Sequence, residues 1–505
     1  MGKAPAREAK ESERQAAGGH FDTEHLMGDL VQRSARGSVV TVSAQAVKFL
    51  LQTGSTMALA RLLTPADFGL LAMVAFFTGI IGLFGDLGLS AATVQRKQIS
   101  HSQVSTLFWV NIAVSIVLML AAAAAAPFVA WFYGEGALLW VTIVISMTYL
   151  WGGLAAQHLA LLRRQMRFTA LASVEICALL FGVAAGISVA LLGGGYWALV
   201  AVAVGQAFAT AVLAFALSGW RPGRWRIDET VKQMILFGGN ITGARFLNYI
   251  TRNSDNLLIG RFWGASELGI YSRAYALLLL PVQQINGPIA GVAIPALSRL
   301  QSKPDEYRRY YLKVVQSLAY MSMPVVVMLA VLAEEVVLLV LGSQWLDAAI
   351  IFQIFAAFVI VQNVVVTTGW VLQSLGRGSR MLKWSAVQAP VFVIACLIGL
   401  PWGGIGVAIA ATIQALLITV PCMLFAYRDS PVSVLGVGKA VLKPVCVAAG
   451  LFLIASGAYI WAIDLDTLVR VGVVVGAAVA YGMAVLLVFE TVREDVLAVR
   501  RVLKR

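Results

Sequence analysis

Polar and charged side chains recur within residues 233–261, an unusually polar candidate for a membrane-spanning helix, where they could bind an anionic ligand. The stripe consists of Arg245, Asn248, Arg252 and Asp255, at successive spacings of three, four and three residues. Such spacings place side chains on one face of an α-helix. The planar guanidinium group of arginine suits bidentate hydrogen bonding to phosphate oxygens. The stripe therefore predicts a water-accessible, cationic binding site.

Two further basic residues belong to the same prediction. Arg273 lies in the next apolar stretch, and Lys48 lies in the first one. Because positive charge then exceeds negative charge, an anionic ligand is favoured. The alternative is an internal ion-pair network, since Arg252 and Asp255 are three residues apart on one helix and could neutralise each other. The two interpretations are compatible.

Asp86 and Glu175 are two more carboxylates within apolar stretches. Ionisable groups inside a bilayer are costly, so they usually face a cavity or one another. Each could be a proton-coupling or cation-coupling site, and each could equally be the structural partner of a nearby arginine or lysine. The sequence leaves both interpretations open.

The apolar composition shows which elements must position these residues. Hydrophobic residues make up 60% of the 505 residues and charged residues 12%, whereas soluble domains are nearer half apolar and a quarter charged. Because a spanning helix needs about 20 mainly apolar residues, we expect an all-α polytopic membrane protein with about fourteen transmembrane helices. The predicted spans are 39–60, 68–94, 104–126, 137–160, 170–192, 196–217, 233–261, 267–297, 313–332, 346–372, 384–401, 404–427, 441–461 and 468–489.

The basic residues predict how these spans are oriented. Most of the 38 lysines and arginines fall in alternate connections and in the two tails, while the other connections are neutral or acidic, as at Glu135, Glu334 and Asp464. Basic connections stay on the cytoplasmic side. We therefore expect an even number of spans with both termini cytoplasmic. The polar residues at the start of the chain predict a cytoplasmic tail rather than a signal peptide.

An internal repeat predicts how the spans are grouped. Residues 43–75 align with residues 243–275 at a fixed offset of 200, which pairs Arg61 with Arg261, Asp67 with Glu267, Gly69 with Gly269 and Lys48 with Asn248. Parallel repeats of this kind build transporters with two similar halves. We expect two pseudo-symmetric six-helix lobes around a central cavity. The predicted segments are a cytoplasmic polar tail (1–36), an N-terminal lobe (37–225), a C-terminal lobe (226–430), two additional transmembrane helices (431–490) and a basic cytoplasmic tail (491–505).

Other kinds of chemistry have little support in the sequence. No nucleotide-binding Gly-x-x-x-x-Gly-Lys-Ser/Thr loop is present, and no connection is long enough for a catalytic domain. The four cysteines lie inside apolar stretches, and the four histidines are scattered. The basic residues are not interleaved with aromatic residues, so the net charge of +13 indicates membrane topology rather than nucleic-acid binding. We expect no cofactor, no metal, no nucleic-acid partner and no enzymatic activity.

Four blocks of sequence carry a resemblance to a known family. They are RLLTPADFGLLAMV (61–74), FGDLGLSAATVQRKQISHSQVSTLFWVN (84–111), LLRRQMRF (161–168) and NSDNLLIGRFWGASELGIYSRAYALLLLPVQQINGPIAGVAIPALSRL (253–300). These blocks resemble the polysaccharide transporter branch of the multidrug/oligosaccharidyl-lipid/polysaccharide (MOP) flippase superfamily, and the resemblance is greatest to the Wzx-type and colanic-acid-exporter-like members. The resemblance implies two six-helix lobes in a bacterial inner membrane and a central cationic role for Arg245, Arg252 and Arg273, with Asp255 as their partner.

The resemblance also implies a function. Members export polyprenyl-pyrophosphate-linked oligosaccharide by alternating access, for exopolysaccharide or lipopolysaccharide synthesis. The partners that the resemblance implies are membrane lipids and a polysaccharide polymerase or export protein. Two alternatives remain. One is an ion-coupled small-molecule antiporter of the same superfamily, against which a cationic site argues. The other is a membrane glycosyltransferase or polymerase, which usually needs a large loop with carboxylates.

Overall fold

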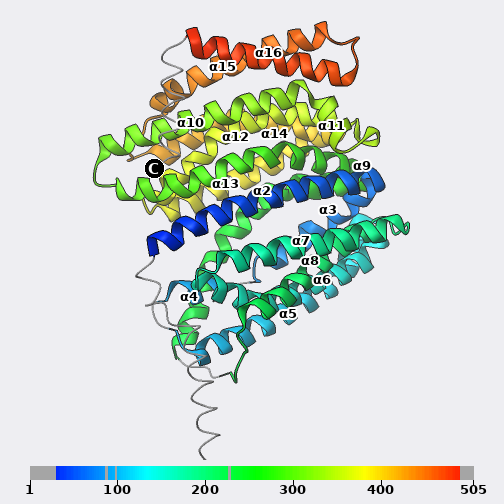
Figure 1. Ribbon diagram of the computed structural model, residues 1–505, viewed down its shortest axis with the longest axis vertical. Helices are drawn as coiled ribbons and strands as arrows, with labels where there is room; N and C mark the ends of the chain where they lie inside the picture. Colours follow the sequence, from blue (N-terminus) through cyan, green and yellow to red (C-terminus); the bar gives the residue numbers. More distant parts are fainter. Residues whose placement is uncertain (1–29, 86–88, 97–98, 226–228, 489–505) are drawn as a thin grey trace, which may run out of the picture. The chain divides into compact units, whose positions relative to one another are not determined.

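The computed structural model describes residues 30–85, 89–96, 99–225 and 229–488, and every regular element in these ranges is a helix (Figure 1). This confirms the predicted all-α fold. The elements are α2 (Leu30–Leu62), α3 (Pro65–Gly82), α4 (Leu89–Gln95), α5 (His101–Tyr133), α6 (Ala137–Arg164), α7 (Phe168–Leu191), α8 (Trp197–Ser218), α9 (Glu229–Arg299), α10 (Pro304–Val331), α11 (Ala333–Val340), η2 (Ser343–Trp345), α12 (Ala348–Ser374), α13 (Gly378–Gly399), η3 (Leu400–Trp402), α14 (Gly403–Tyr427), α15 (Val434–Trp461) and α16 (Thr467–Val488).

Eleven helical stretches of the described chain are long and apolar enough to cross a membrane. Two of these stretches each contain two helices: Tyr249–Arg299 is interrupted at Gly264, and Gly378–Tyr427 joins α13 to α14. The polar first helix, α2, is not among the eleven. The structure is therefore compatible with the fourteen predicted spans.

One predicted span differs in the structure. Residues 68–94 form two helices, α3 and α4, rather than one continuous helix. The break follows Gly82, where the chain turns through Leu83, Phe84 and Gly85. Glycine is unfavourable in a helix interior because it loses the most backbone entropy on folding, so two glycines this close favour a helix end.

Side-chain caps define the starts of two helices. The Thr64 hydroxyl accepts a hydrogen bond from the Asp67 N–H, and the Asp67 carboxylate accepts one from the Thr64 N–H. Ser100 and Gln103 form the same reciprocal arrangement at the start of α5. These capping boxes satisfy backbone donors that the first helical turn leaves without partners.

The chain divides into two compact units, each with its own set of packed helices. Unit 1 comprises residues 1–249 and 264–266, and unit 2 comprises residues 250–263 and 267–505. In unit 1, α5 packs on α6, and α8 packs on both α6 and α7. In unit 2, α10 packs on α12, and α14 packs on both α12 and α13. The same order of neighbours thus recurs in each unit, as an internal repeat requires, while the predicted segment boundaries stay predictions.

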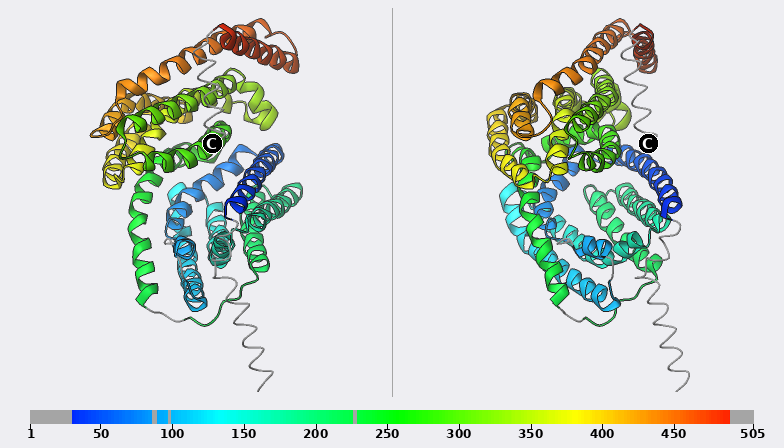
Figure 2. Two further views of the ribbon diagram at one scale, coloured as in Figure 1. Left: turned by 60° about the vertical axis from the view of Figure 1, so that its left-hand side comes forward. Right: turned by 90° about the vertical axis from the view of Figure 1, so that its left-hand side faces the viewer.

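The last two helices, α15 and α16, pack onto the helices of unit 2. Helix α15 packs along α10, and α16 packs along α15. Figures 1 and 2 show α15 and α16, coloured orange to red, side by side in every view. A buried cluster of aromatic and aliphatic side chains, which includes Tyr307, Tyr311 and Tyr427, joins α10 to α12, α14 and α15.

A left-handed turn also recurs in both units. Met166 connects α6 to α7 with φ of 54°, and Gly376 connects α12 to α13 with φ of 67°. In both turns the following arginine donates its N–H to a helix carbonyl, from Arg167 to Leu162 at 3.0 Å and from Arg377 to Leu372 at 2.8 Å. The turn is therefore a feature of the repeat itself, even though one copy has no glycine.

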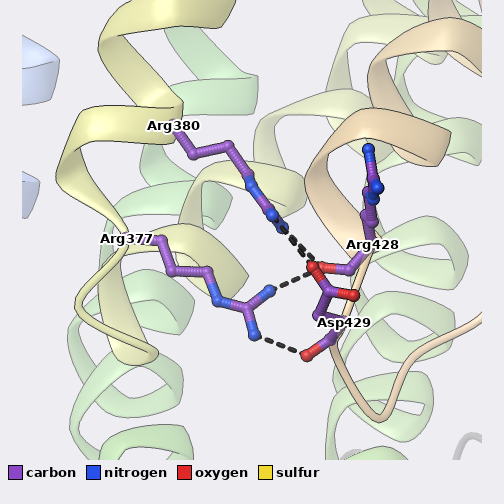
Figure 3. A network of polar contacts seen from close by, with 4 residues as sticks. All are labelled: Arg377, Arg380, Arg428 and Asp429. Atoms are coloured by element: carbon purple, nitrogen blue, oxygen red, sulfur yellow. Dashed lines mark hydrogen bonds and ion pairs between the residues drawn. The ribbon is translucent and has the colours of Figure 1, made fainter.

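Arg377 also helps to hold α13 against the end of α14. Figure 3 shows the guanidinium groups of Arg377 and Arg380 directed at the turn formed by Arg428 and Asp429. Arg377 donates to the Arg428 carbonyl at 2.6 Å, and Arg380 donates to the Asp429 carboxylate at 3.0 Å. The hydrogen bond from Arg380 lowers the pKa of Asp429. Basic side chains thus satisfy the carbonyl groups that a helix end leaves without partners.

Candidate functional site

The predicted cationic stripe lies on α9, which is two helical segments joined by a sharp turn. Gly264 interrupts the helix with φ of 83° and ψ of −175°. Residues 229–263 form the first segment and residues 265–299 the second. Only glycine adopts such a conformation readily.

Two hydrogen bonds within unit 2 hold the residues that flank the turn of α9. The Trp263 Nε1–H donates to the Leu400 carbonyl at 2.8 Å. The Glu267 carboxylate accepts from the Gly404 N–H at 2.9 Å. Leu400 belongs to η3 and Gly404 to the first turn of α14, so this part of unit 2 holds the end of the first segment, which carries the stripe.

Asp255 is buried and holds hydrogen bonds within α9. Only 7% of its surface is exposed. One carboxylate oxygen accepts from the Tyr271 hydroxyl at 2.9 Å, and the other accepts from the Asn256 N–H at 2.8 Å. Tyr271 lies on the second segment, so this contact shows that the two segments fold back against each other. Buried carboxylates need such donors because desolvation of a charge is costly.

Arg252, by contrast, is exposed on the first segment. No ion pair joins Arg252 to Asp255 in the described part of α9. The structure therefore does not contain the ion pair between Arg252 and Asp255 that we considered as an alternative. The physical reason is that Tyr271 and the backbone already supply donors to the carboxylate.

The other predicted members of the stripe are described to different extents. Arg273 is half-buried on the second segment of α9. Arg245 and Asn248 belong to the first segment, but their side chains lie outside the described residues, as does Asp86 altogether. Of the predicted site residues, unit 2 thus contains Arg252, Asp255 and Arg273.

Lys48 and Glu175 form an ion pair in unit 1. The Lys48 Nζ lies 2.7 Å from a Glu175 carboxylate oxygen, and the pair connects α2 to α7. The side chains remain 24% and 43% exposed. Of the two roles considered for Glu175, the geometry matches the structural partner of a lysine.

The sequence did not indicate the partner of Asp255. Tyr271 is 16 residues further along the chain, and nothing in its spacing distinguishes it from Tyr275. Two of the scattered histidines also turn out to be neighbours, because His101 and His158 both contact the Trp220 ring. Such contacts depend on how separate helices pack together, and helical periodicity carries no information on that packing.

The repeat is visible in the contacts made by its acidic residues. In unit 2, the Glu267 carboxylate accepts from the Gly404 N–H in the first turn of α14. In unit 1, the matching Asp67 lies beside Gly195 between α7 and α8, so close that a Cβ atom there would be 3.2 Å from the carboxylate oxygen. The matched residues therefore lie at equivalent places in both units, each beside the start of the sixth helix of its set.

Two other features of the described chain lie apart from the stripe. A cavity of about 670 Å³ in unit 2 is surrounded by α10, α12 and α15, and none of the predicted site residues lines it. The described residues contain no group of three or more histidine, cysteine or acidic side chains that could hold a metal ion.

Comparisons with known proteins agree with the resemblance seen in the sequence. The family model described as "Polysaccharide biosynthesis protein" matches residues 58–350. The teichuronic acid biosynthesis protein TuaB of Bacillus subtilis (strain 168) is 26% identical over 382 residues, covering 74% of this chain and 78% of that protein. The lipopolysaccharide biosynthesis protein WzxC of Escherichia coli (strain K12) is 25% identical over 375 residues, covering 73% and 75%.

Solved structures share the fold. The lipid II flippase MurJ in an inward closed conformation superposes with a TM-score of 0.67 at 13% identity, covering 90% of this chain and 99% of MurJ. An inward-facing multidrug resistance MATE family transporter of the MOP superfamily gives a TM-score of 0.61 at 14% identity, covering 75% and 94%. The fold is thus that of MurJ and of MATE transporters. With a family model that matches more than half of its length, this chain belongs to the polysaccharide biosynthesis protein family of multi-pass bacterial membrane proteins.

Proposed function

We propose that the protein is a flippase that moves polyprenyl-pyrophosphate-linked oligosaccharide across the bacterial inner membrane. The head group enters from the cytoplasm, arginines hold the pyrophosphate, and alternating access releases the head group outside. The proposal includes both termini on the cytoplasmic side and a non-enzymatic mechanism.

The observation that carries the proposal is the exposed Arg252 on a membrane helix. An arginine within a spanning helix costs up to about 3 kcal/mol on insertion scales, so it does not persist against lipid without a role. Its carboxylate neighbour, Asp255, accepts hydrogen bonds from Tyr271 and from the backbone instead. The guanidinium group is therefore available to an anion, and its fork suits the adjacent oxygens of a pyrophosphate.

The names of similar proteins support the same substrate class. TuaB and WzxC are named for the biosynthesis of teichuronic acid and lipopolysaccharide. MurJ, whose fold this chain shares, is named a lipid II flippase. We propose that this chain likewise acts on a lipid-linked sugar.

Energy and partners follow from what the chain contains. Its sequence has no nucleotide-binding loop, so we propose that an ion gradient or the gradient of the substrate itself drives transport. A polysaccharide polymerase or export protein that takes up the released substrate is the proposed partner. We propose no cofactor and no nucleic-acid ligand.

The alternative functions fit the charges less well. A small-molecule antiporter for cationic compounds would favour an acidic stripe, whereas Arg245 and Arg252 make this stripe basic. A membrane glycosyltransferase or polymerase would need a catalytic set of carboxylates, and the buried Asp255 already holds two structural hydrogen bonds.

A test in cells uses two substitutions at one position. In a strain that lacks the gene, Arg252→Ala should abolish polysaccharide export, while Arg252→Lys should retain part of it because the charge remains without the fork. Both variants should reach the membrane at wild-type levels, as measured by immunoblotting of membrane fractions. Normal export by the alanine variant would refute the assignment of Arg252.

A further inference from the structure

A long groove lies within unit 2, apart from the stripe on α9. It is the cavity of about 670 Å³ between α10, α12 and α15. The wall formed by α15 runs from Val445 to Ile460, along residues that recur every three or four positions and therefore share one face of the helix. This face rises by about 22 Å. Because one leaflet of the hydrocarbon core is about 15 Å thick, the groove is long enough for one acyl chain.

Small side chains explain why the groove exists. Helix α10 packs on both α12 and α15 and forms the floor, where Met323 and Val327 are buried. Five of the residues that line the groove are alanines, namely Ala330 on α10, Ala356 and Ala357 on α12, and Ala448 and Ala449 on α15. Since alanine carries only a methyl group, the walls leave an apolar space that their own side chains do not fill. Such a space is matched to hydrocarbon rather than to water.

Polar groups collect at one end of the groove. Glu334, Gln353, Ser456 and Tyr459 all line it. The Gln353 amide donates to the Ala330 carbonyl at 3.4 Å, which places this amide near the end of α10, just before Glu334 begins the first turn of α11. The groove therefore has an apolar body and a polar end, as an amphipathic lipid does.

The charge at the polar end is negative. Glu335 is buried, and its carboxylate pairs with the Arg470 guanidinium at 3.0 Å. The same guanidinium lies over the Tyr459 ring, 5.4 Å from its centroid. Glu334 is exposed, and none of the ion pairs in the described part of the chain includes it. Because Glu335 already holds Arg470, the Glu334 carboxylate is matched to a cation from outside the protein.

We propose that the groove binds a phospholipid whose head group carries a primary ammonium, phosphatidylethanolamine. One acyl chain lies between α12 and α15, and the ammonium group pairs with Glu334. The polyprenyl pyrophosphate of the proposed substrate is a poorer match, since its anionic head group and Glu334 would repel each other. This inference goes beyond the proposed flippase function, because the ligand is a lipid of the membrane itself.

The test of the head group compares two lipids on the full-length protein in detergent. Native mass spectrometry measures the binding of phosphatidylethanolamine and phosphatidylglycerol with the same acyl chains. Wild-type protein should bind the ethanolamine lipid about threefold more tightly, as one exposed ion pair contributes. Glu334→Gln should bind the two lipids equally. Glu135→Gln is the matched control, since it removes an exposed carboxylate from unit 1 and should keep the preference.

The test of the acyl chain fills the groove. Ala449→Phe and Ala357→Phe place a ring in it from opposite walls, and both alanines are exposed, so neither ring disturbs buried packing. Each should weaken binding of both lipids by about tenfold, the effect of losing contact with two methylene groups. Leu453→Phe is the control on α15, because Leu453 is exposed and does not line the groove. Melting temperatures show whether each variant is folded.

Three results would overturn the inference. The first is equal binding of the two lipids by wild-type protein, or a preference that survives Glu334→Gln. The second is unchanged binding in both phenylalanine variants, which would place the acyl chain elsewhere. The third is displacement of the ethanolamine lipid by an equal amount of undecaprenyl pyrophosphate, which would assign the groove to the tail of the substrate. None of these results bears on the assignment of Arg252, so the flippase proposal is tested separately.

Discussion

At the scale of single residues, the stripe on α9 depends on how Asp255 is held. Its carboxylate is buried, and the Tyr271 hydroxyl is the side-chain donor that reaches it, at 2.9 Å. Hydrogen bonds to charged groups contribute about 1.5–3 kcal/mol, more than those between neutral groups. The Tyr271 hydroxyl therefore stabilises the contact between the two segments of α9. Because it occupies the Asp255 carboxylate, this carboxylate does not form an ion pair with Arg252.

The residue-scale prediction concerns this hydroxyl. Tyr271→Phe should lower the free energy of unfolding by about 1–3 kcal/mol, because a buried carboxylate loses a donor. The measurement is the thermal melting of the purified protein in detergent. Tyr275→Phe is the matched control, since both tyrosine rings pack against Phe355, with ring centroids 5.1 Å and 4.9 Å away. Equal destabilisation by the two variants would show that the hydrogen bond contributes nothing.

Periodicity predicted part of this arrangement and missed the rest. Spacings of three and four placed Arg252 and Asp255 on one side of a helix, and both do lie on α9. The partner of Asp255 could not be predicted, because Tyr271 reaches it only through the reversal at Gly264. The sequence likewise did not identify Lys48, 127 residues away, as the partner of Glu175, because helical periodicity does not report contacts between separate helices.

At the scale of helices, the left-handed turns define where one helix ends and the next begins. The turn after α6 uses Met166, and the equivalent turn after α12 uses Gly376. A left-handed residue with a side chain costs about 1–2 kcal/mol relative to glycine. At Gly376 a Cβ atom would meet nothing within 4 Å, so backbone conformation alone determines the effect of a substitution there.

The helix-scale prediction follows from this. Gly376→Ala should destabilise the protein by about 1 kcal/mol, since alanine must adopt the left-handed conformation. Gly378→Ala, two residues later at the start of α13, also meets open space but has an ordinary backbone conformation. It should be neutral or slightly stabilising. Parallel melting curves measure both, and a cost at Gly378 equal to that at Gly376 would contradict the account.

The sequence predicted the presence of the long helices better than it predicted where each helix begins and ends. Long apolar runs predicted α5, α6 and α7 well, because about 20 apolar residues in a row leave few other structures. The single span expected at 68–94 was wrong, since the glycines at 82 and 85 end α3 before α4 begins. The short helix α11 was not predicted, because eight residues carry too little periodic signal.

At the scale of the whole molecule, the distribution of charge predicts the orientation in the membrane. Basic connections such as the one with Arg163 and Arg167 are expected inside, and the acidic connection with Glu135 outside. Both Arg167 and Glu135 are exposed in the structure and accessible to reagents. The family and the fold were predictable from the four blocks of sequence, whereas orientation rests on charge alone.

The prediction for orientation uses single cysteines in a cysteine-free background. A cysteine at Glu135 should react with a membrane-impermeant maleimide in intact spheroplasts. A cysteine at Arg167 should react only after the membrane is permeabilised. The reverse pattern would place the termini outside and reverse the proposed direction of transport.

The central claim is that an exposed arginine on α9 moves a pyrophosphate-linked sugar through the bilayer. The most direct test is a reconstituted assay in proteoliposomes, in which labelled lipid-linked oligosaccharide crosses from one leaflet to the other. Wild-type protein should move the label, and Arg252→Ala should reduce the rate to that of protein-free liposomes. Equal rates for wild-type and Arg252→Ala protein, or no movement by the wild type, would contradict the account.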